Sequence, residues 1–346
     1  MNYDEIRNKK YLTQLNELMD SLPEICISFF KNIEGRTSVR TRIGYANDLR
    51  LFFYYLTVEL KCDTPISYHT LNTLKYTDID DYMKWLIEYN IDGKIYTNGS
   101  ASRARKLSSL SSFFNFCFDT ELITSNPTHK AGKIKVPLKE IVILSQEEKT
   151  MLLDTVKNGT GLKVSQLPYF HKDKIRDYTI IAFLLETGVR ISELTSIDID
   201  DINFTAHKIK IIRKGGNEYS IYISDKTEAA LKEYITLYRK TYLSESSKEK
   251  ALFITRRGKR MAVRSIQDML KKYVKSAALS LKISPHKLRA TFGTDFYDIT
   301  GDIYLTSDYL GHSSVVTAQK HYARLSEQRR YDHRNVIDMV NESTIP

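Results

Sequence analysis

The stretch RDYTIIAFLLETGVRISELTSIDIDDI, residues 176–202, gives the clearest indication of the fold. Its apolar residues predict a helix that is interrupted at Gly188, and Arg190 and Glu193 follow that glycine. Downstream, HKIKIIRKGGNEYSIYIS, residues 207–224, alternates like two strands around a Gly-rich tetrapeptide that begins at Lys214. This pattern predicts a β-hairpin. The remaining residues return to helical patterns, so this half of the chain is predicted to be mostly α-helical with a small β-sheet.

Upstream, the first ~125 residues are predicted to be entirely helical. Three segments have apolar residues at helical spacing, namely residues 37–60, 77–90 and 100–122. Thr77 or Asp78 is the expected N-cap of the second helix, and Asn126-Pro127 is expected to end the third. Residues 163–174, KVSQLPYFHKDK, are predicted to form a loop.

The boundary between two domains is predicted near residues 128–143, a Pro-, Gly- and Lys-rich stretch without helical period. This linker separates an N-terminal domain, residues 1–127, from a C-terminal domain, residues 144–346. Ser145 with Glu148 three residues later forms a capping-box signature at the start of the second domain.

The composition is that of a soluble globular protein, with 346 residues, 42% hydrophobic and 27% charged. No apolar run approaches the roughly 18–20 residues of a membrane span, and the start of the chain is too polar for a secretory signal. A cytoplasmic location is therefore expected. The cysteines Cys26, Cys62 and Cys117 have no CxxC spacing, which argues for buried thiols rather than disulfides or a zinc site.

A net charge of +10 favours a polyanionic partner. Between residues 248 and 275 only Glu249 and Asp268 oppose ten basic residues, which favours phosphate contact. Simple solubility explains the basic residues of the N-terminal helices equally well. The residues predicted to bind DNA are Arg40, Arg42, Arg103, Arg105, Lys106, Arg256, Arg257, Lys259, Arg260 and Arg264.

Four short motifs bear side chains suited to chemistry on a phosphodiester. TGVRISEL contains Arg190, RKGGNE contains Lys214, SPHKLRATFGT contains His286 and Arg289, and LGHSS contains His312. Each motif taken singly also has a simpler explanation. Arg190 could form a local salt bridge with Glu193, and Lys214 could be a solvated lysine. His286 and Arg289 could form an exposed polar stripe, and His312 could be a helix cap. Together they suit attack by a tyrosine, since arginines can grip phosphate oxygens, histidines can assist proton transfer and a lysine can protonate a leaving oxygen. No acidic cluster with metal spacing accompanies them.

The order and the sequences of these motifs closely resemble those of the tyrosine recombinase (phage integrase) family. The resemblance runs from about residue 25 to about 330. It implies that Arg190, Lys214, His286, Arg289 and His312 are catalytic, that Glu193 supports Arg190, and that Tyr322 is the nucleophile. The sequence departs from the family pattern in two places. Ala290 stands where many members have a histidine, and Tyr322 follows His312 by ten residues (322 − 312), one more than is usual. Tyr331 is the nearest alternative nucleophile.

The resemblance also implies a two-domain, C-shaped DNA clamp with a helical, SAM-like core-binding domain, a catalytic domain and a C-terminal tail. The implied reaction cuts and rejoins DNA through a 3′-phosphotyrosyl link and a Holliday junction, without cofactor or metal. The implied partners are double-stranded DNA with inverted-repeat core sites and three further copies of the chain in a tetramer. An accessory DNA-bending protein is a further candidate partner, which the sequence does not determine. A Xer-like resolvase and the integrase of a mobile element fit equally well.

Two other functions compete with recombination. A DNA-binding relative that has lost catalysis should lack at least one reacting residue, yet all six are present. A type IB topoisomerase uses similar chemistry, but the N-terminal helical region and the family-like motifs favour recombination.

Overall fold

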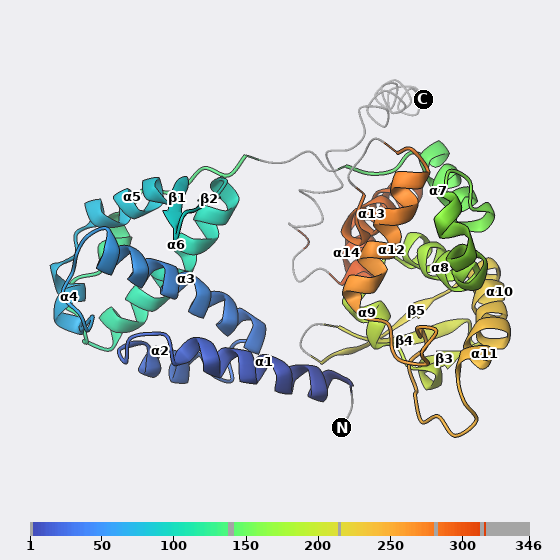
Figure 1. Ribbon diagram of the computed structural model, residues 1–346, viewed down its shortest axis with the longest axis horizontal. Helices are drawn as coiled ribbons and strands as arrows, with labels where there is room; N and C mark the ends of the chain where they lie inside the picture. Colours follow the sequence, from blue (N-terminus) through green and yellow to red (C-terminus); the bar gives the residue numbers. More distant parts are fainter. Residues whose placement is uncertain (1–2, 138–141, 214–215, 280–282, 312–314, 316–346) are drawn as a thin grey trace, which may run out of the picture. The chain divides into compact units, whose positions relative to one another are not determined.

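The computed structural model describes residues 3–137, 142–213, 216–279, 283–311 and residue 315. The chain divides into two compact units, Met1–Lys139 and Glu140–Pro346, each with its own hydrophobic core (Figure 1). The chain is mainly helical and the C-terminal unit contains a small antiparallel sheet, as predicted for the fold class; the N-terminal unit contains a small antiparallel sheet as well. Within the described residues, no helix is both long and apolar enough to cross a membrane.

The N-terminal unit is built from helices around an aromatic core. Phe29, Phe52, Phe113 and Phe114 are fully buried, and their rings meet edge to face at centroid distances of 5.5–5.9 Å. These residues lie on α2, α3 and α6. The helices of this unit are α1 (Tyr3–Met19), α2 (Cys26–Ile33), α3 (Val39–Val58), α4 (Tyr68–Thr73), α5 (Tyr76–Trp85), α6 (Ser100–Asp119) and a 3-10 helix (Pro127–Lys130).

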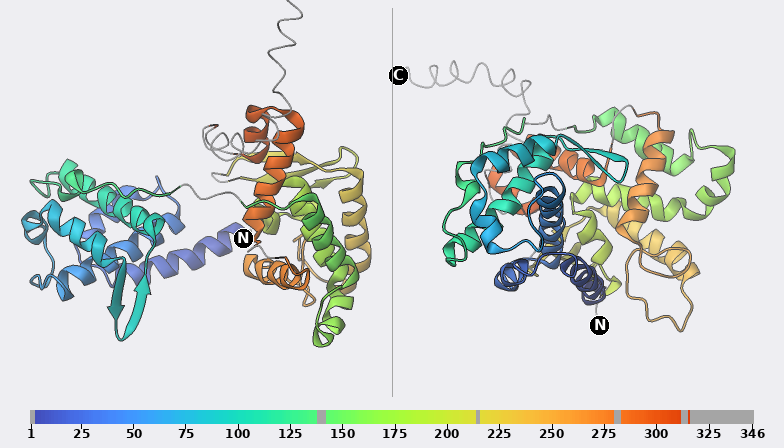
Figure 2. Two further views of the ribbon diagram at one scale, coloured as in Figure 1. Left: turned by 90° about the horizontal axis from the view of Figure 1, so that it is seen from above. Right: turned by 60° about the vertical axis from the view of Figure 1, so that its left-hand side comes forward.

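The prediction that this region is entirely helical was wrong, because it contains a β-hairpin. Strands β1 (Glu88–Ile91) and β2 (Lys94–Thr97) pair around Asp92-Gly93, and the hairpin projects from the helices (Figure 2). Asp92 and Gly93 both have positive φ, 50° and 78°, which is the pattern of a type I′ hairpin turn. Stacking of Trp85 on Tyr89 at 4.4 Å, and of Tyr89 on Tyr96 at 5.3 Å, stabilises the strands.

Two helix ends in this unit also differ from prediction. The N-cap of α5 is Lys75, and Asp78 instead accepts a hydrogen bond from the Lys75 backbone N–H at 2.7 Å. Helix α6 ends at Asp119, while Asn126 caps the following 3-10 helix by accepting from the Thr128 N–H at 2.9 Å. Thr128 is buried and the Gly132 N–H donates to Asp80 at 3.0 Å, so the first residues of the predicted linker pack on the N-terminal unit.

The C-terminal unit is organised around the long, largely buried helix α8. The capping box of Ser145 and Glu148 starts its first helix, as predicted. The elements in chain order are α7 (Gln146–Asn158), a 3-10 helix (Val164–Gln166), α8 (Leu167–Thr187), α9 (Ile191–Ser196), a 3-10 helix (Ile199–Asp201), β3 (Ile202–Asn203), β4 (Lys208–Ile212), β5 (Glu218–Tyr222), α10 (Asp225–Glu233), a π-helix (Tyr234–Arg239), α11 (Lys240–Tyr242), α12 (Val263–Ser276), α13 (Pro285–Thr300) and α14 (Ile303–Leu310).

The predicted hairpin is confirmed: β4 and β5 pair antiparallel from Lys208↔Tyr222 to Ile212↔Glu218. The short strand β3 extends it to three strands in the order β3-β4-β5. Its inward side chains, Ile209, Ile211 and Ile221, are buried in the core of the unit.

The loop predicted at residues 163–174 is instead a 3-10 turn followed by the start of α8. Pro168 lies in the first turn of α8, where a proline is tolerated because the N–H groups there have no partner within the helix. Phe170 and Asp173, which lie in this part of α8, are buried.

Candidate active site

The site begins where α8 ends. Gly188 has a φ of +59°, a left-handed conformation that closes the helix. A Cβ at this position would lie 2.3 Å from Cδ1 of Phe292 and 3.0 Å from Cδ2 of Leu310. Glycine is therefore required both for the backbone turn and for the close approach of α8 to α13 and α14.

This turn makes Arg190 the N-cap residue of α9. The Arg190 backbone N–H donates to Glu193 Oε2 at 2.8 Å, and its Nη1 donates to Glu193 Oε1 at 2.6 Å. The Glu193 side chain is 5% exposed, whereas that of Arg190 is 35% exposed. A buried carboxylate thus orients a guanidinium that still reaches the surface. Arg190 Nη2 also donates to the carbonyl of Gly311 at 2.9 Å, so the contact with Glu193 is more than a local salt bridge.

The second predicted arginine lies on α13 and points to the same place. Arg289 is 5% exposed; its Nη1 donates to the Gly188 carbonyl at 2.6 Å and its Nη2 donates to the Leu310 carbonyl. His286 lies three residues earlier, in the first turn of the same helix, and is exposed. The expectation that His286 and Arg289 share a face of one helix agrees with this placement, although one is at the surface and the other is buried.

A third arginine, which the sequence analysis did not single out, completes the cluster. Arg213 is the last described residue before the hairpin tip. Its Nη1 donates to the Asp308 carbonyl at 2.9 Å and its Nη2 to the Tyr309 carbonyl at 2.6 Å. Only its position next to Lys214 could have indicated it, because the partners are backbone atoms about 95 residues away.

The four carbonyls from Asp308 to Gly311 therefore all accept hydrogen bonds from arginines that come from three distant segments. Gly311 has a φ of +62°, and a Cβ there would lie 2.7 Å from the guanidinium carbon of Arg213. The glycine of LGHSS thus makes the left-handed turn after α14 and leaves room for Arg213.

The structure brings Arg190, Glu193 and Arg289 together at the end of α14. Lys214, His312, Tyr322, Tyr331 and the predicted C-terminal tail lie outside the described residues. Chain connectivity alone puts Lys214 directly after Arg213, and His312 directly after Gly311.

The basic residues between 248 and 275 have more acidic partners than the sequence indicated. Arg260 is 10% exposed; it donates to Asp198 and, at 2.8 Å, to the carbonyl of Thr195. Arg256 lies 3.5 Å from Asp173. Within the stretch itself only Glu249 and Asp268 are acidic, but the fold adds acidic partners from outside it, namely carboxylates of α8 and of the segment after α9. Arg264 pairs with Asp268 at 3.1 Å, as expected for residues four apart on a helix, while Arg257 and Lys259 are exposed.

In the N-terminal unit, Asp48 is the partner of two residues predicted to bind DNA. Its carboxylate is 1% exposed and accepts from both terminal nitrogens of Arg105, from Lys106 at 3.2 Å and from the Ser109 hydroxyl at 2.7 Å. This buried carboxylate explains Lys106, whose side chain is 11% exposed, more directly than solubility or phosphate contact does, whereas the Arg105 side chain is 54% exposed.

The other three predicted DNA-binding residues of this unit also have neighbours within it. Arg42 pairs with Glu34 at 2.8 Å, Arg103 donates to the Met83 carbonyl at 3.3 Å, and Arg40 lies over the ring of Tyr11 at 5.4 Å.

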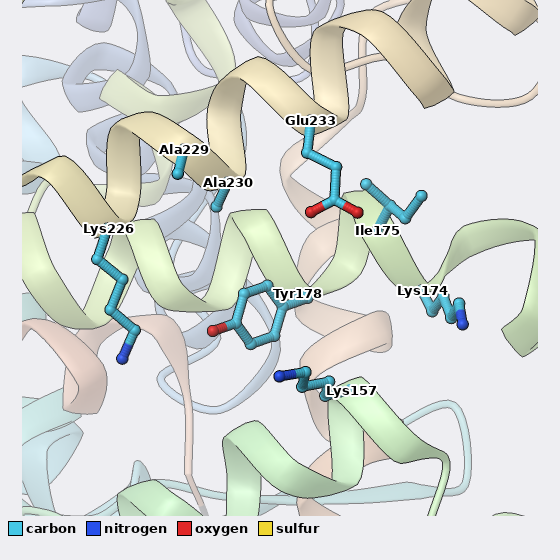
Figure 3. Close-up of a pocket in the computed structure, with 8 residues that line it drawn as sticks. All are labelled: Lys157, Lys174, Ile175, Tyr178, Lys226, Ala229, Ala230 and Glu233. Atoms are coloured by element: carbon cyan, nitrogen blue, oxygen red, sulfur yellow. The ribbon is translucent and has the colours of Figure 1, made fainter.

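A separate cavity of about 340 Å³ lies between α7, α8 and α10 (Figure 3). Its polar lining consists of Lys157, Lys174, Lys226, Tyr178 and Glu233. Among the predicted catalytic residues that the structure describes, Arg190, His286 and Arg289 do not line this cavity, so we assign it no part in their chemistry.

Comparison with known proteins identifies the class to which this fold and site belong. The family model described as the phage integrase family matches residues 143–329. Tyrosine recombinase XerC of Caldanaerobacter subterraneus subsp. tengcongensis is 32% identical over 304 residues, which cover 85% of this chain and 80% of that protein. The chain belongs to the phage integrase family of tyrosine recombinases. It is a site-specific tyrosine recombinase, a DNA-binding enzyme of DNA recombination.

Solved structures share the fold at lower sequence identity. XerH site-specific recombinase, bound to palindromic difH substrate in a post-cleavage complex, matches with a TM-score of 0.66 and 18% identity over 88% of this chain and 81% of that chain. A lambda integrase tetramer bound to a Holliday junction matches with a TM-score of 0.61 and 14% identity over 91% of this chain and 76% of that chain.

Proposed function

We propose that this recombinase cuts and rejoins DNA with Tyr322 as the nucleophile and with Arg190, Lys214, His286, Arg289 and His312 as the other catalytic residues. The Tyr322 oxygen attacks the scissile phosphorus, the bond to the 5′ oxygen breaks, and a 3′-phosphotyrosyl link forms. The 5′-hydroxyl of a partner strand then attacks this link and releases the tyrosine. The energy of the broken phosphodiester is retained in the protein–DNA ester, so rejoining needs no ATP.

Each residue has a role that follows from its chemistry. Arg190 and Arg289 bind the non-bridging oxygens of the pentacoordinate phosphorane, where their fixed positive charge stabilises the transition state. Glu193 keeps Arg190 in place. His286 and His312 assist proton transfer and hydrogen-bond the phosphate, and Lys214 protonates the departing 5′ oxygen.

One observation carries this proposal: Arg190 and Arg289, from different helices, donate to the adjacent carbonyls of Gly311 and Leu310, immediately before His312 in the chain. The fold and the order of the motifs in the sequence therefore both support our placing the phosphate here. We propose that the substrate is duplex DNA with inverted-repeat core sites, and that four copies act on two duplexes through a Holliday junction. The likeness to the lambda integrase tetramer supports this assembly.

Among the basic residues, we propose that exposed Arg257, Lys259 and Arg264 contact the DNA backbone, with Arg40 and half-exposed Arg105 in the N-terminal unit. Because Arg260 and Lys106 are largely buried in ion pairs with Asp198 and Asp48, we assign them a structural role.

The test is covalent trapping on labelled, nicked duplexes with a randomised core, in buffer containing a chelator. Wild-type protein is expected to give an adduct on a denaturing gel, and Tyr322→Phe none; Tyr331→Phe is the matched control and should behave like wild type. Sequencing the trapped DNA identifies the site. Absence of an adduct with wild type despite salt-sensitive binding, or an adduct that persists in Tyr322→Phe, would overturn the assignment.

A further inference from the structure

We propose that Arg213 is a positioning residue that ties the hairpin segment directly before Lys214 in the sequence to the end of α14, two residues before His312 in the sequence. This inference rests on the proposed function, because it concerns how two of the proposed catalytic residues are brought into register. Arg213 is not assigned a contact with the phosphate, because its guanidinium lies against the Tyr219 ring while its terminal nitrogens donate to the Asp308 and Tyr309 carbonyls.

The contacts of Arg213 join two segments that are distant in the sequence. Its backbone N–H donates to the Asn217 carbonyl at 2.9 Å, which fixes it at the base of the hairpin tip. Its side chain donates to the carbonyls of Asp308 and Tyr309 at the end of α14. The last carbonyls of a helix have no partner within the helix, and the negative end of the helix dipole attracts a cation. Arg213 therefore stabilises the end of α14 and fixes its distance from the hairpin.

Neighbouring side chains support this bridge. The Arg213 guanidinium carbon lies 3.2 Å from the centroid of the Tyr219 ring, and the Tyr219 hydroxyl donates to Asp308 Oδ2 at 3.0 Å. The Tyr309 hydroxyl also donates a hydrogen bond to the Tyr222 carbonyl at 3.2 Å, which joins α14 to the hairpin a second time. The absence of a side chain on Gly311 lets the turn lie directly against the guanidinium.

In this arrangement the three arginines have different roles. Arg190 and Arg289 donate to the last two carbonyls of the turn and are the proposed phosphate ligands. Arg213 occupies the two preceding carbonyls, so the end of α14 keeps two arginine hydrogen bonds when the other guanidiniums contact a phosphate. Loss of Arg213 is expected to shift Lys214 relative to the leaving oxygen, and a displacement of about 1 Å in such a group can cost about 100-fold in rate.

The experiment compares two nicked substrates in single-turnover cleavage, one ordinary and one with sulfur replacing the bridging 5′ oxygen. A thiolate leaves without being protonated, so the sulfur substrate does not need the general acid. With the ordinary substrate, Arg213→Ala and Arg213→Lys are expected to cleave about 10- to 100-fold more slowly than wild type. With the sulfur substrate, we expect at least about a 10-fold smaller defect, as for Lys214→Ala. Arg213→Lys keeps the charge but has one nitrogen for two carbonyls, so it tests the geometry if the alanine variant folds poorly.

Lys210→Ala is the matched control, since it removes a cation from the same hairpin that pairs only with Asp201 and Glu218 among the contacts described, and it should cleave both substrates like wild type. Equal slowing of an Arg213 variant on both substrates would mean a general folding or binding defect and would overturn the inference. So would wild-type rates on both. Failure of wild type to form an adduct, or an adduct with Tyr322→Phe, would instead overturn the proposed function.

Discussion

At the scale of single residues, two glycines determine where the proposed phosphate ligands lie. Gly188 and Gly311 are both left-handed, and a Cβ at either would collide with a neighbour within 3 Å, namely Phe292 or Arg213. Each glycine immediately precedes a segment with a proposed catalytic residue, Arg190 or His312. The two turns therefore connect backbone conformation directly to the geometry of the site.

We predict that Gly188→Ala reduces single-turnover cleavage by at least about 100-fold, because relief of the clash with Phe292 must move the backbone that leads to Arg190. Left-handed strain adds about 1–2 kcal/mol of destabilisation. Gly44→Ala is the control: Gly44 lies inside α3, and a Cβ added there would have no atom within 4 Å, so stability should rise by about 0.5–1 kcal/mol with cleavage unchanged. Cleavage at the wild-type rate by Gly188→Ala would contradict the account of this turn.

At the scale of elements, the buried carboxylate of Asp48 joins α3 to α6. We predict that Asp48→Ala destabilises the N-terminal unit by about 3 kcal/mol, because it leaves Lys106 and Ser109 without their partner in the interior. Asp81→Ala is the control; it breaks an exposed pair with Lys84 and should cost less than about 0.5 kcal/mol. Trp85 is the only tryptophan and lies in this unit, so urea unfolding followed by tryptophan fluorescence measures both variants. Equal stability of the two variants would refute the structural role of Asp48.

Elements with strong local signals were predictable, whereas those that depend on distant partners were not. The Ser145 capping box, the β4–β5 hairpin and the interruption at Gly188 follow from local residue types. The β1–β2 hairpin was missed because its strands continue a helical apolar pattern, although Asp92-Gly93 is a turn signal. Of the site, the motifs indicated Arg190, Glu193 and Arg289. They did not indicate Arg213, because its partners are backbone carbonyls brought to it only by the tertiary fold.

At the scale of the whole molecule, all three thiols of the chain lie in the N-terminal unit, so their reactivity probes the packing of that unit. We predict that native protein has one accessible thiol, Cys62, and that all three react after denaturation. Burial raises the pKa of Cys117 to about 12 and that of Cys26 still further, and only a thiolate reacts. Burial also raises the pKa of Cys62, so its reaction should be slow at neutral pH and faster as the pH rises. Native Cys62→Ser should be unreactive; rapid labelling of that variant would show that the N-terminal core is not packed as described.

The distribution of basic residues predicts how the whole molecule binds DNA. Replacing exposed Arg257 and Lys259 by alanine should lower the slope of log affinity against log salt by about 2, because each phosphate contact releases counterions. Arg260→Ala should leave the slope unchanged and instead lower stability, since it breaks the buried contacts with Asp198 and the Thr195 carbonyl. The salt slope is measured by titrating salt into the complex with a fluorescent duplex, and the stability of each variant is measured by urea unfolding. An unchanged slope in the double variant would place the DNA backbone elsewhere.

The central claim, that DNA becomes joined to Tyr322, is tested most directly by mapping the attachment site in the trapped complex. Trypsin cuts after Lys320 and Arg324 to release HYAR, residues 321–324, and after Arg330 and Arg334 to release YDHR, residues 331–334. After nuclease treatment, mass spectrometry should find the nucleotide remnant on tyrosine in HYAR, with YDHR unmodified. A remnant on YDHR, or on any peptide without Tyr322, would contradict the account.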